Sequence, residues 1–332
     1  MEWVPAVLGE VTERGVRCRL CPHHCVLGHG QVGACKVRRG SADGGLETAT
    51  FASSVAHVDT VERKPFFHYR PGTSTVTLAA PGCSFRCDYC VNFRISQYGR
   101  DDESVWNANA VDPADIVGQA AAMGGNVALS YTEPSLAPEL TLELARLGRD
   151  VGVEIVWKSN GFLTPEAVAL TAPAVAAVNI DLKGVDEQSH RRLTGGSVRP
   201  VIETIGLFRE HGTWVEVSTP IIPGVTEPAR VADVLAGIST EIPWHLVRFT
   251  PAYRMRDEDP TSPDDIADAV AAGRAAGLKY VYVERALGDD GRATRCPKCG
   301  STVLSRGVWS LRENRIVAGR CPDCGTAIEG RW

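Results

Sequence analysis

Strand-like and helix-like segments alternate from residue 75 to residue 283, and this pattern limits the fold more than any other feature of the sequence. The strand-like segments are short and rich in Val and Ile, and the segments between them are amphipathic. Such alternation is typical of a parallel sheet with right-handed crossovers. We predict an α/β fold of about six or seven strand–helix units, either barrel-like or open and doubly wound. The expected strands cover residues 74–80, 126–134, 153–161, 177–184, 213–224, 244–252 and 278–288.

The composition is that of a globular protein. The chain has 332 residues, of which 44% are hydrophobic, and a formal net charge of −5. An acidic balance gives no reason to expect a nucleic acid or an anionic membrane as a partner. No apolar run approaches the roughly 18 to 20 residues of a membrane span, and the N-terminus lacks the pattern of a secretory signal. We expect a cytoplasmic protein with one large domain and a small appendage, or with two modest domains.

The cysteines fall into three groups of four, three and four. Disulfides are disfavoured in a reducing compartment, so grouped thiols indicate metal ligation. Buried cysteines that act as small apolar residues would not be grouped in this way. The groups are Cys18, Cys21, Cys25 and Cys35; Cys83, Cys87 and Cys90; and Cys296, Cys299, Cys321 and Cys324.

The central group lies on one loop, "GCSFRCDYC", directly after the first strand-like run. A 4Fe–4S cluster normally takes four thiolates. Three thiolates leave one iron with an open coordination position, where another molecule can bind. Structural zinc is the alternative, but it requires four closed ligands, and His68 could complete the set only by folding back.

The two outer groups have the spacing of further metal sites. In the C-terminal group, two C-x2-C pairs flank a hairpin-like stretch, which predicts a zinc ribbon; rubredoxin-like iron or a cluster is the alternative. The N-terminal group has C-x2-C-x3-C-x9-C spacing and encloses His23 and His24, either of which could replace a cysteine. We interpret it as a second zinc site, with an auxiliary 4Fe–4S cluster as the alternative.

Polar side chains fall at or just past the ends of the expected strands. In barrels and in open parallel sheets, this edge carries the chemistry. A metal-bearing adaptor without catalysis would need neither such an edge nor an open iron. The residues are Cys83, Glu133, Ser159, Asn160, Asp181, Lys183, Ser218 and His245.

The central loop resembles the C-x3-C-x2-C cluster loop of the radical S-adenosylmethionine (SAM) enzymes. The stretches "CRLCPHHC", "VERKPFFHYRPG" and "NIDLKG" resemble the AmmeMemoRadiSam-system branch, which is related to the pyruvate formate-lyase activating enzymes. The resemblance implies a partial (β/α)6 TIM-type barrel with SAM across its top. It also implies that SAM chelates the open iron and is cleaved reductively to a 5′-deoxyadenosyl radical. We divide the chain into an N-terminal four-cysteine metal-binding segment (1–70), the barrel (71–290) and a zinc ribbon (291–332).

The resemblance also implies roles for single residues. Tyr89 would pack near the adenine, and the backbone of Tyr131 to Glu133, in "YTEP" where the family has "GGEP", would meet the methionine amino group. Lys158 stands where formate-lyase activators carry an acidic residue that helps to hold a monovalent cation, and we hypothesise that its ammonium replaces that cation. The other expected SAM contacts are Ser159, Asn160, Asp181, Lys183 and His245. Without the resemblance, the Asp–Lys pair would be interpreted as a salt bridge and the histidine as structural.

Substrate-facing residues are expected from the later strands. Arg248 and Arg254 suit a carboxylate or a phosphate, although a salt bridge at the edge is the alternative. We expect hydrogen abstraction from a small molecule, specifically the decarboxylation of a uronic-acid nucleoside in antibiotic biosynthesis, by a lyase. The alternative is an activating enzyme that generates a glycyl radical on a partner protein. Flavodoxin or ferredoxin is the expected electron donor. The candidate substrate residues are Glu216, Ser218, Arg248, Thr250, Tyr253 and Arg254.

Overall fold

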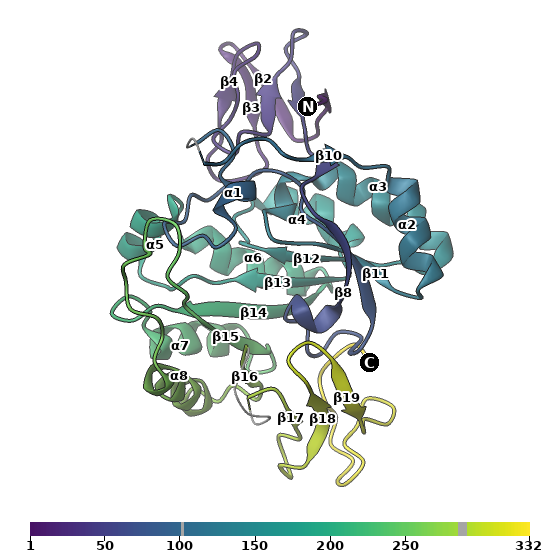
Figure 1. Ribbon diagram of the computed structural model, residues 1–332, viewed down its shortest axis with the longest axis vertical. Coiled ribbons are helices and arrows are strands. Elements are labelled where there is room, and N and C mark those ends of the chain that lie inside the picture. The colour runs from purple at the N-terminus through teal and green to yellow at the C-terminus, as the bar shows by residue number, and fades with distance from the viewer. Residues whose placement is uncertain (101–102, 285–290) are drawn as a thin grey trace.

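A parallel sheet runs through the middle of the molecule, with small antiparallel sheets at the two ends of its long axis (Figure 1). The structure is a computed structural model, which describes residues 1–100, 103–284 and 291–332. The prediction of an α/β fold with a parallel sheet is confirmed. In the described part of the chain, no helix combines the length and the apolar composition that a membrane span requires.

The main sheet has the order β16-β15-β14-β13-β12-β11-β9-β8 within the described residues. Each expected strand is present within the described residues, although residues 285–288 of the last one lie outside them. The strands β9 and β11 to β16 pair in parallel. The strand β8 was not expected and pairs antiparallel with β9. The strands are β8 Ala56–Thr60, β9 Ser74–Leu78, β11 Asn126–Leu129, β12 Ile155–Ser159, β13 Ala177–Asp181, β14 Trp214–Ile221, β15 Trp244–Arg248 and β16 Val281–Val283.

Helices connect these strands and cover one face of the sheet, here called the outer face. Several begin with Pro in the first turn after a capping side chain: Asp112 caps α2, Thr164 caps α4, and Ser262 caps α8 in a capping box. The helices are α1 Phe93–Ser96, α2 Pro113–Ala122, α3 Pro138–Gly148, α4 Pro165–Thr171, α5 Glu187–Thr194, α6 Arg199–Glu210, α7 Pro228–Ile238 and α8 Pro263–Ala275. Short 3₁₀ turns cover Val61–Arg63, Pro134–Leu136, Arg149–Val151 and Ala172–Ala174.

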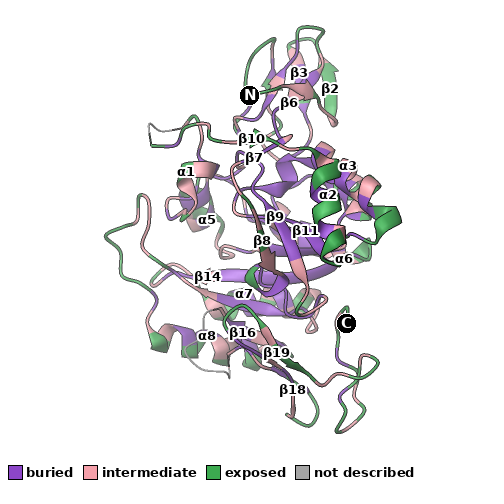
Figure 2. Cartoon of the chain, turned by 45° about the vertical axis from the view of Figure 1, so that its right-hand side comes forward, coloured by how far each residue is buried: buried purple, intermediate pink, exposed green. Residues whose placement is uncertain are grey.

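The main core lies between the outer face and the helices. Trp157 of β12 and Val178 of β13 pack there with helix residues such as Leu144 and Phe208. The strands are buried, whereas α2 turns exposed residues to solvent (Figure 2). Because side chains alternate along a strand, the residues between these apolar ones point to the opposite, inner face. That face carries the polar residues of the candidate site.

Residues 61–69, here called the floor segment, cover the part of the inner face that lies away from the polar edge of the sheet. None of the α-helices among the described residues covers this part. Val61, Phe66 and Tyr69 pack on apolar residues of four strands. The neighbouring Phe67 packs with Tyr282 and with the C-terminal sheet. The floor segment therefore fills the space that lies below the polar edge of the sheet. The strand residues beneath it are Ala128, Val156, Ala177 and Trp214.

The outer cysteine groups lie in the two parts of the chain that form the small sheets, mostly in the loops of these parts. The predicted boundary after residue 70 stays a prediction, and the predicted boundary at residue 290 falls outside the described residues. N-terminal strands are β1 Val4–Pro5, β2 Gly9–Thr12, β3 Gly15–Cys18, β4 Val26–Leu27, β5 Arg38–Gly40, β6 Leu46–Thr48 and β7 Ala52–Ser53, which pairs with β10 Asn109–Ala110. C-terminal strands are β17 Thr294–Arg295, β18 Thr302–Arg306 and β19 Leu311–Asn314.

Candidate active site

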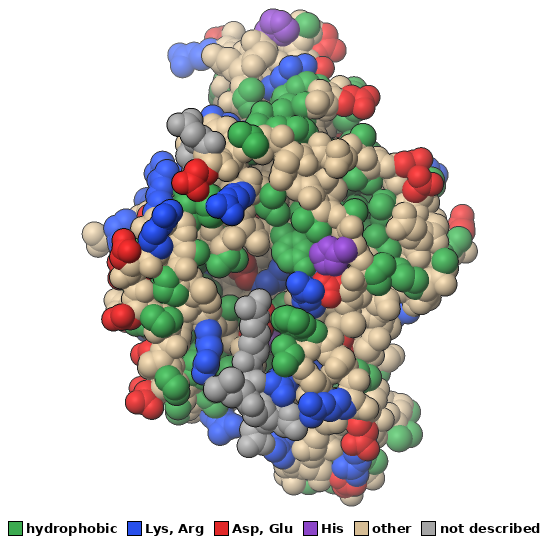
Figure 3. Space-filling model, viewed as in Figure 1, with side chains coloured by type: hydrophobic (Ala, Val, Ile, Leu, Met, Phe, Trp, Pro, Cys, Tyr) green, Lys and Arg blue, Asp and Glu red, His purple; other side chains and the backbone are tan. Residues whose placement is uncertain are grey.

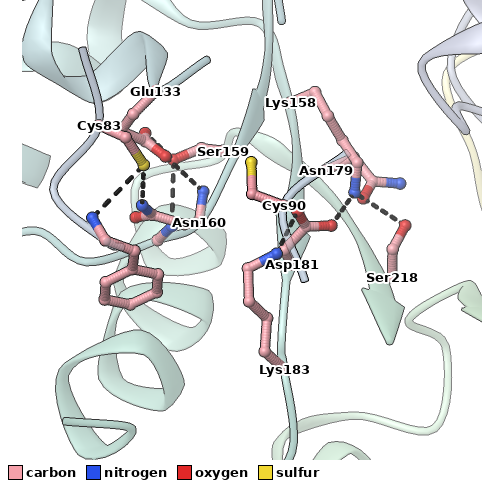
Figure 4. A network of polar contacts seen from close by, with 12 residues as sticks. Cys83, Cys90, Glu133, Lys158, Ser159, Asn160, Asn179, Asp181, Lys183 and Ser218 are labelled. Atoms are coloured by element: carbon pink, nitrogen blue, oxygen red, sulfur yellow. Dashed lines mark hydrogen bonds and ion pairs between the residues drawn. The ribbon is translucent and has the colours of Figure 1, made fainter. Parts of the chain in front are cut away.

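The three-cysteine loop lies at the carboxyl end of β9, directly before α1. The Cys83 sulfur accepts hydrogen bonds from the Phe85 N–H at 3.4 Å and from the Asn160 side-chain amide at 3.6 Å (Figure 4). Burial raises the pKa of Cys83 well above its usual value and that of Cys87 to about 12. A bound metal centre would reverse this effect, because its positive charge favours the thiolate.

The donor set fits a cluster with three protein ligands. Among the described residues, no His, Cys, Asp or Glu joins these three thiols in a closed group of the kind that a single metal ion requires. The Tyr89 hydroxyl beside the last cysteine is buried and has no hydrogen-bond partner in the described part of the structure. A buried polar group without a partner is costly, so a molecule bound over the loop would satisfy this hydroxyl.

Glu133 joins the loops that follow β11 and β12. One carboxylate oxygen accepts hydrogen bonds from the Ser159 hydroxyl at 2.6 Å and the Ser135 N–H at 3.0 Å. The other accepts the Asn160 N–H at 2.8 Å (Figure 4). Burial raises the pKa of Glu133, although these donors oppose the shift. Protein donors thus already satisfy the Glu133 carboxylate. The SAM contact expected of residues 131–133 would therefore come from their backbone.

Tyr131 has a backbone conformation that glycine adopts more readily. Its φ is 68°, in the left-handed region, where the related enzymes have glycine. Its hydroxyl lies 3.1 Å from the Lys64 ammonium, 3.3 Å from His57 Nε2 and 3.4 Å from an Asp59 carboxylate oxygen. These contacts to β8 and to the floor segment hold the ring in place, and they offset part of the backbone strain.

Lys158, Asp181 and Lys183 form a charged cluster on the inner face, at the ends of β12 and β13 (Figure 4). Both ammonium groups pair with Asp181, that of Lys183 at 3.0 Å. The Lys158 ammonium also donates to the Asn179 side-chain oxygen at 2.7 Å. Burial would raise the pKa of Asp181, but the two lysines outweigh it and lower that pKa to about 2. With both lysines protonated, these three side chains together carry a net charge of +1.

The surface is hollowed over this part of the sheet, and acidic and basic side chains are visible inside the hollow (Figure 3). The side chains of Lys158, Asp181 and Lys183 are 17%, 27% and 14% exposed, so solvent reaches them. Ser159 and Asn160 lie beside them and adjoin Cys83 through the Asn160 amide. The structure therefore brings together the cluster loop and most of the residues that the sequence places near SAM.

Glu216 is not available to a substrate, which corrects the sequence-based expectation. It is fully buried, and its carboxylate accepts hydrogen bonds from the backbone of Phe67 and His68 and from the Trp214 indole at 2.9–3.1 Å. His245 contacts the same carboxylate at 2.6 Å. The cause is its position on β14, because Glu216 faces inward below Ser218 and under the floor segment.

His245 lies level with Ser218 in the sheet register and is also buried. Its ring packs edge-on against Phe67 and stacks on Tyr282. Its second ring nitrogen, Nδ1, is buried without a hydrogen-bond partner among the described residues. A contact of His245 with SAM therefore stays a prediction.

The other substrate candidates do not meet at the charged cluster. Ser218 donates to Asn179 at 2.7 Å inside the sheet, and Thr250 is exposed. By strand alternation, Arg248 lies on the outer face with Trp244 and Leu246. The expectation that these residues form one substrate site together with Glu216 is therefore not met.

Tyr253 and Arg254 pack against the outside of the cluster loop. The Tyr253 ring stacks on Phe93 of α1 at 4.5 Å, and the Arg254 N–H donates to the Asp88 carbonyl at 2.9 Å. Both residues line a cavity of about 490 Å³, whose charged lining residues are all basic. The cavity is thus suited to an anionic group. Its basic lining residues are His23, Lys36, Arg86, Arg100 and Arg254.

Two residues at the site were missed by the sequence analysis. Asn179 was part of the quoted "NIDLKG", and its inward position, two residues before Asp181, would have identified it. Arg100 donates to the carbonyls of Cys83 at 2.8 Å and Phe85 at 2.5 Å, and thus fixes the cluster loop. No pattern in the sequence singles out this arginine, because its partners are backbone oxygens.

The four C-terminal cysteines lie close enough together to hold one metal ion. Their sulfur atoms all lie within 4.8 Å of one another, with Cys296 and Cys324 at 3.5 Å and Cys299 and Cys321 at 3.7 Å. Thiolates around one tetrahedral ion with bonds of about 2.3 Å meet at such distances. This four-cysteine group fits the predicted zinc ribbon.

Comparison with known proteins finds similarity over the central part of the chain and, for one relative, over most of its length. The profile of the radical SAM superfamily matches residues 78–235. An uncharacterized protein of Methanocaldococcus jannaschii is 32% identical over 91% of this chain and 91% of its own length. The isethionate sulfite-lyase activating enzyme of Nitratidesulfovibrio vulgaris is 29% identical over 44% of this chain and 50% of that one. The AdoMet-dependent heme synthase of Methanosarcina barkeri is 25% identical over 55% of this chain and 52% of that one, so the match spans about half of each of these two relatives.

Proposed function

Because this chain belongs to the radical SAM superfamily, we propose that it cleaves SAM reductively and uses the radical formed to abstract hydrogen from a small anionic molecule. The observation that carries the proposal is the arrangement at the end of β9. Three thiols lie on one loop without a fourth protein ligand among the described residues, next to a partly exposed charged cluster on the inner face. A structural metal site with four protein ligands requires neither an open coordination position nor a charged cluster beside it.

Cys83, Cys87 and Cys90 would hold a 4Fe–4S cluster, which supplies the electron that breaks the S–C5′ bond of SAM when it is bound. The chain's own residues would bind and orient the cofactor. The net positive charge of Lys158, Asp181 and Lys183 would attract the SAM carboxylate. Tyr89 would offer its unpartnered hydroxyl and its ring to the adenosine moiety. Glu133 would keep the loops after β11 and β12 in register with the cysteine loop.

The proposed activity can be tested with SAM alone. Anaerobically reconstituted protein with dithionite is expected to form 5′-deoxyadenosine, whereas Cys83→Ala should form none. Val91→Ala is a matched control, because Val91 lies on the same loop and is 65% exposed. Absence of 5′-deoxyadenosine from wild-type protein that carries about four irons at this loop would contradict the proposal and favour a metal-bearing adaptor.

For the substrate, we propose a small molecule with a carboxylate, specifically a uronic-acid nucleoside that is decarboxylated. Arg254, whose backbone N–H donates to the Asp88 carbonyl of the cluster loop, carries a guanidinium near this loop, which supports a substrate with a carboxylate. Release of CO2 in step with 5′-deoxyadenosine from a glycosyl-carboxylate nucleoside would support this substrate. If such nucleosides leave the slow, substrate-free formation of 5′-deoxyadenosine unchanged, the decarboxylase proposal fails while the SAM chemistry stands.

A second candidate is an activating enzyme for a partner protein, which the isethionate sulfite-lyase activating enzyme among the relatives favours. The two candidates differ in where the abstracted hydrogen originates. With an activating enzyme, incubation with a glycyl-radical partner deuterated at glycine would give deuterated 5′-deoxyadenosine and a persistent glycyl radical signal in electron paramagnetic resonance (EPR). With a small-molecule enzyme, only the deuterated small substrate would give deuterated 5′-deoxyadenosine, and no glycyl radical signal would form.

We propose that the electron donor is an acidic, low-potential protein of the flavodoxin or ferredoxin type. The basic cavity borders Ser84 and Arg86 of the cluster loop, which supports docking of an acidic surface at this point. Arg86→Glu should slow the reaction with such a donor and leave the dithionite-driven reaction unchanged. An equal effect on both reactions would argue against donor docking at this cavity.

A further inference from the structure

The N-terminal cysteines line one small, buried cavity. The N-terminal strands lie at the end of the molecule next to α1 (Figure 1). Cys18, Cys21 and Cys35 are buried, and Cys25 is half-buried. The backbone N–H of Ala34 points to the Cys25 sulfur at 3.5 Å. The four thiols therefore face a common centre.

The spacing of these thiols differs from that of the C-terminal group. Among the described residues, only the C-terminal cysteines have all their donor atoms within 4.8 Å of one another. Sulfur atoms around a single tetrahedral ion also leave no room for a water-sized void between them. The N-terminal cysteines instead surround a cavity of about 10 Å³, roughly the space that the centre of one water molecule needs. A cubane cluster separates its four thiolates by four irons, so it suits this wider spacing.

Arg38 provides a second, independent indication of a charged occupant. Its side chain is 1% exposed and borders the same cavity. One terminal nitrogen contacts the Val7 carbonyl and lies 3.2 Å from a Glu139 carboxylate oxygen. Its Nε and its other terminal nitrogen have no hydrogen-bond partner in the described part of the chain. A buried guanidinium with unused donors is costly unless an acceptor such as a cluster sulfur completes it.

We propose that Cys18, Cys21, Cys25 and Cys35 bind a second 4Fe–4S cluster and that Arg38 is its buried counter-ion and hydrogen-bond donor. All four irons would have protein ligands, so this cluster would not bind SAM. The wider spacing thus favours the cluster over the zinc ion that the sequence suggested. A cluster whose four irons all have protein ligands would serve to transfer single electrons.

The second site adjoins the three-cysteine loop directly. The His23 ring N–H donates to the Ser84 carbonyl at 2.8 Å. Arg100 donates to the carbonyls of Ala34, next to Cys35, and of Cys83, at 2.5 and 2.8 Å. Gly82 is so close to Cys35 that a Cβ there would lie 2.8 Å from the Cys35 carbonyl oxygen. The N-terminal cluster would accept one electron from a low-potential donor and pass it on, returning to its oxidised state as the first cluster is reduced.

Metal analysis tests the site in the full-length protein. We expect about eight irons and one zinc for each reconstituted wild-type chain, since each cluster holds about four irons. Cys18→Ala/Cys21→Ala should lose about four irons, and so should Cys83→Ala/Cys87→Ala. The reduced Cys83→Ala/Cys87→Ala protein should keep a cluster EPR signal that SAM does not alter. Two zinc ions and about four irons in the wild type would overturn the proposal, as would an iron-free Cys83→Ala/Cys87→Ala protein.

The counter-ion role of Arg38 has its own readout. Replacing a positive charge and its N–H donors near a cluster should lower the cluster's reduction potential. Arg38→Met is therefore expected to lower the midpoint potential of the SAM-insensitive signal, and Arg38→Lys should restore part of the loss. A merely structural role would reduce cluster content without a change of potential, and an unchanged potential in both variants would refute this part of the proposal. Because these signals need no SAM cleavage, they stay informative if the proposed SAM chemistry fails.

Discussion

Lys158 and Lys183 share a single carboxylate, and this excess of positive charge has a consequence for SAM binding. Both ammonium groups contact Asp181, and Lys158 is also fixed by Asn179. Asn179 is held in turn by the Ser218 hydroxyl at 2.7 Å. The Lys158 ammonium is therefore positioned before any ligand binds, as a fixed substitute for a bound monovalent cation would be.

Lys158→Met is expected to raise the KM for SAM by roughly ten- to a hundredfold, because it removes a charge-assisted contact worth about 1.5–3 kcal/mol. SAM cleavage by the wild type should not depend on K⁺ or Na⁺, whereas Lys158→Asp should create such a dependence. Both are measured by 5′-deoxyadenosine formation in buffers with different salts. Lys279→Met, which removes an exposed lysine, is the control. A wild-type enzyme that requires K⁺ would rule out the cation-replacement hypothesis.

Tyr131 should show an unusual preference for glycine over alanine. At a φ of 68°, alanine retains the left-handed strain of about 1–2 kcal/mol, whereas glycine does not. Tyr131→Gly is therefore expected to unfold at a higher urea concentration than Tyr131→Ala, although both lose the ring contacts to Lys64 and Asp59. The reverse order would show that the backbone conformation at this position is not strained.

At the scale of single elements, the strand ends were predictable from the sequence. Parallel strands end at one edge, so the polar residues after β12 and β13 had to converge there. Register was the part that could not be read from the sequence. Glu216 and Ser218 both point inward from β14 and are two residues apart. The earlier position on the strand places Glu216 under the floor segment. The strand β8 and the floor segment owe their positions to long-range packing, for which the local sequence has no periodic signal.

Glu133 couples two of these strand ends. Glu133→Ala leaves the Ser159 hydroxyl and two backbone N–H groups without their acceptor in a buried place, at a cost of about 2–4 kcal/mol. We expect a corresponding loss in the free energy of unfolding and weaker SAM binding, measured by urea titration and by the KM for SAM. Glu133→Gln keeps an acceptor oxygen and should lose less. Equal losses in both variants would mean that the negative charge itself matters.

On the scale of the whole molecule, the floor segment joins the sheet to the C-terminal sheet. His68 is fully buried and contacts the Tyr282 hydroxyl and the Glu329 carbonyl at 2.5 and 2.6 Å. The Arg331 N–H donates to the His68 carbonyl at 2.7 Å, and Arg306 reaches the Phe67 carbonyl. Residues 67–68 and residues near the C-terminus thus complete one polar network beneath the candidate active site.

This network predicts a loss of stability in mild acid. Burial lowers the pKa of His68 from its usual 6.5 to about 4. The unfolded chain therefore takes up a proton first, and folding stability falls as the pH drops from 6.5 to 4, by about 2 kcal/mol at pH 5. His68→Gln should flatten this part of the stability profile in urea titrations, whereas His29→Gln, at an exposed histidine, should not. A profile that is equally steep in His68→Gln would assign the acid sensitivity to other groups.

Loss of the C-terminal metal should weaken the main sheet as well as the ribbon. Cys299→Ser is expected to lower the free energy of unfolding by on the order of several kcal/mol, because a structural metal contributes directly to folding. Circular dichroism would follow the helices of the main domain during thermal unfolding. Lys298→Ala, beside Cys299 and exposed, is the control. An unchanged transition for these helices would show that the C-terminal sheet unfolds independently.

The floor segment also determines the order in which the protein can be completed during synthesis. Residues 66–70 emerge from the ribosome early, but their partners at Arg306 and Arg331 are made more than two hundred residues later. Until then, the carbonyls of Phe67 and His68 and the N–H of Arg70 lack these native hydrogen-bond partners. The base of the inner face is therefore completed only after the C-terminal sheet has been made.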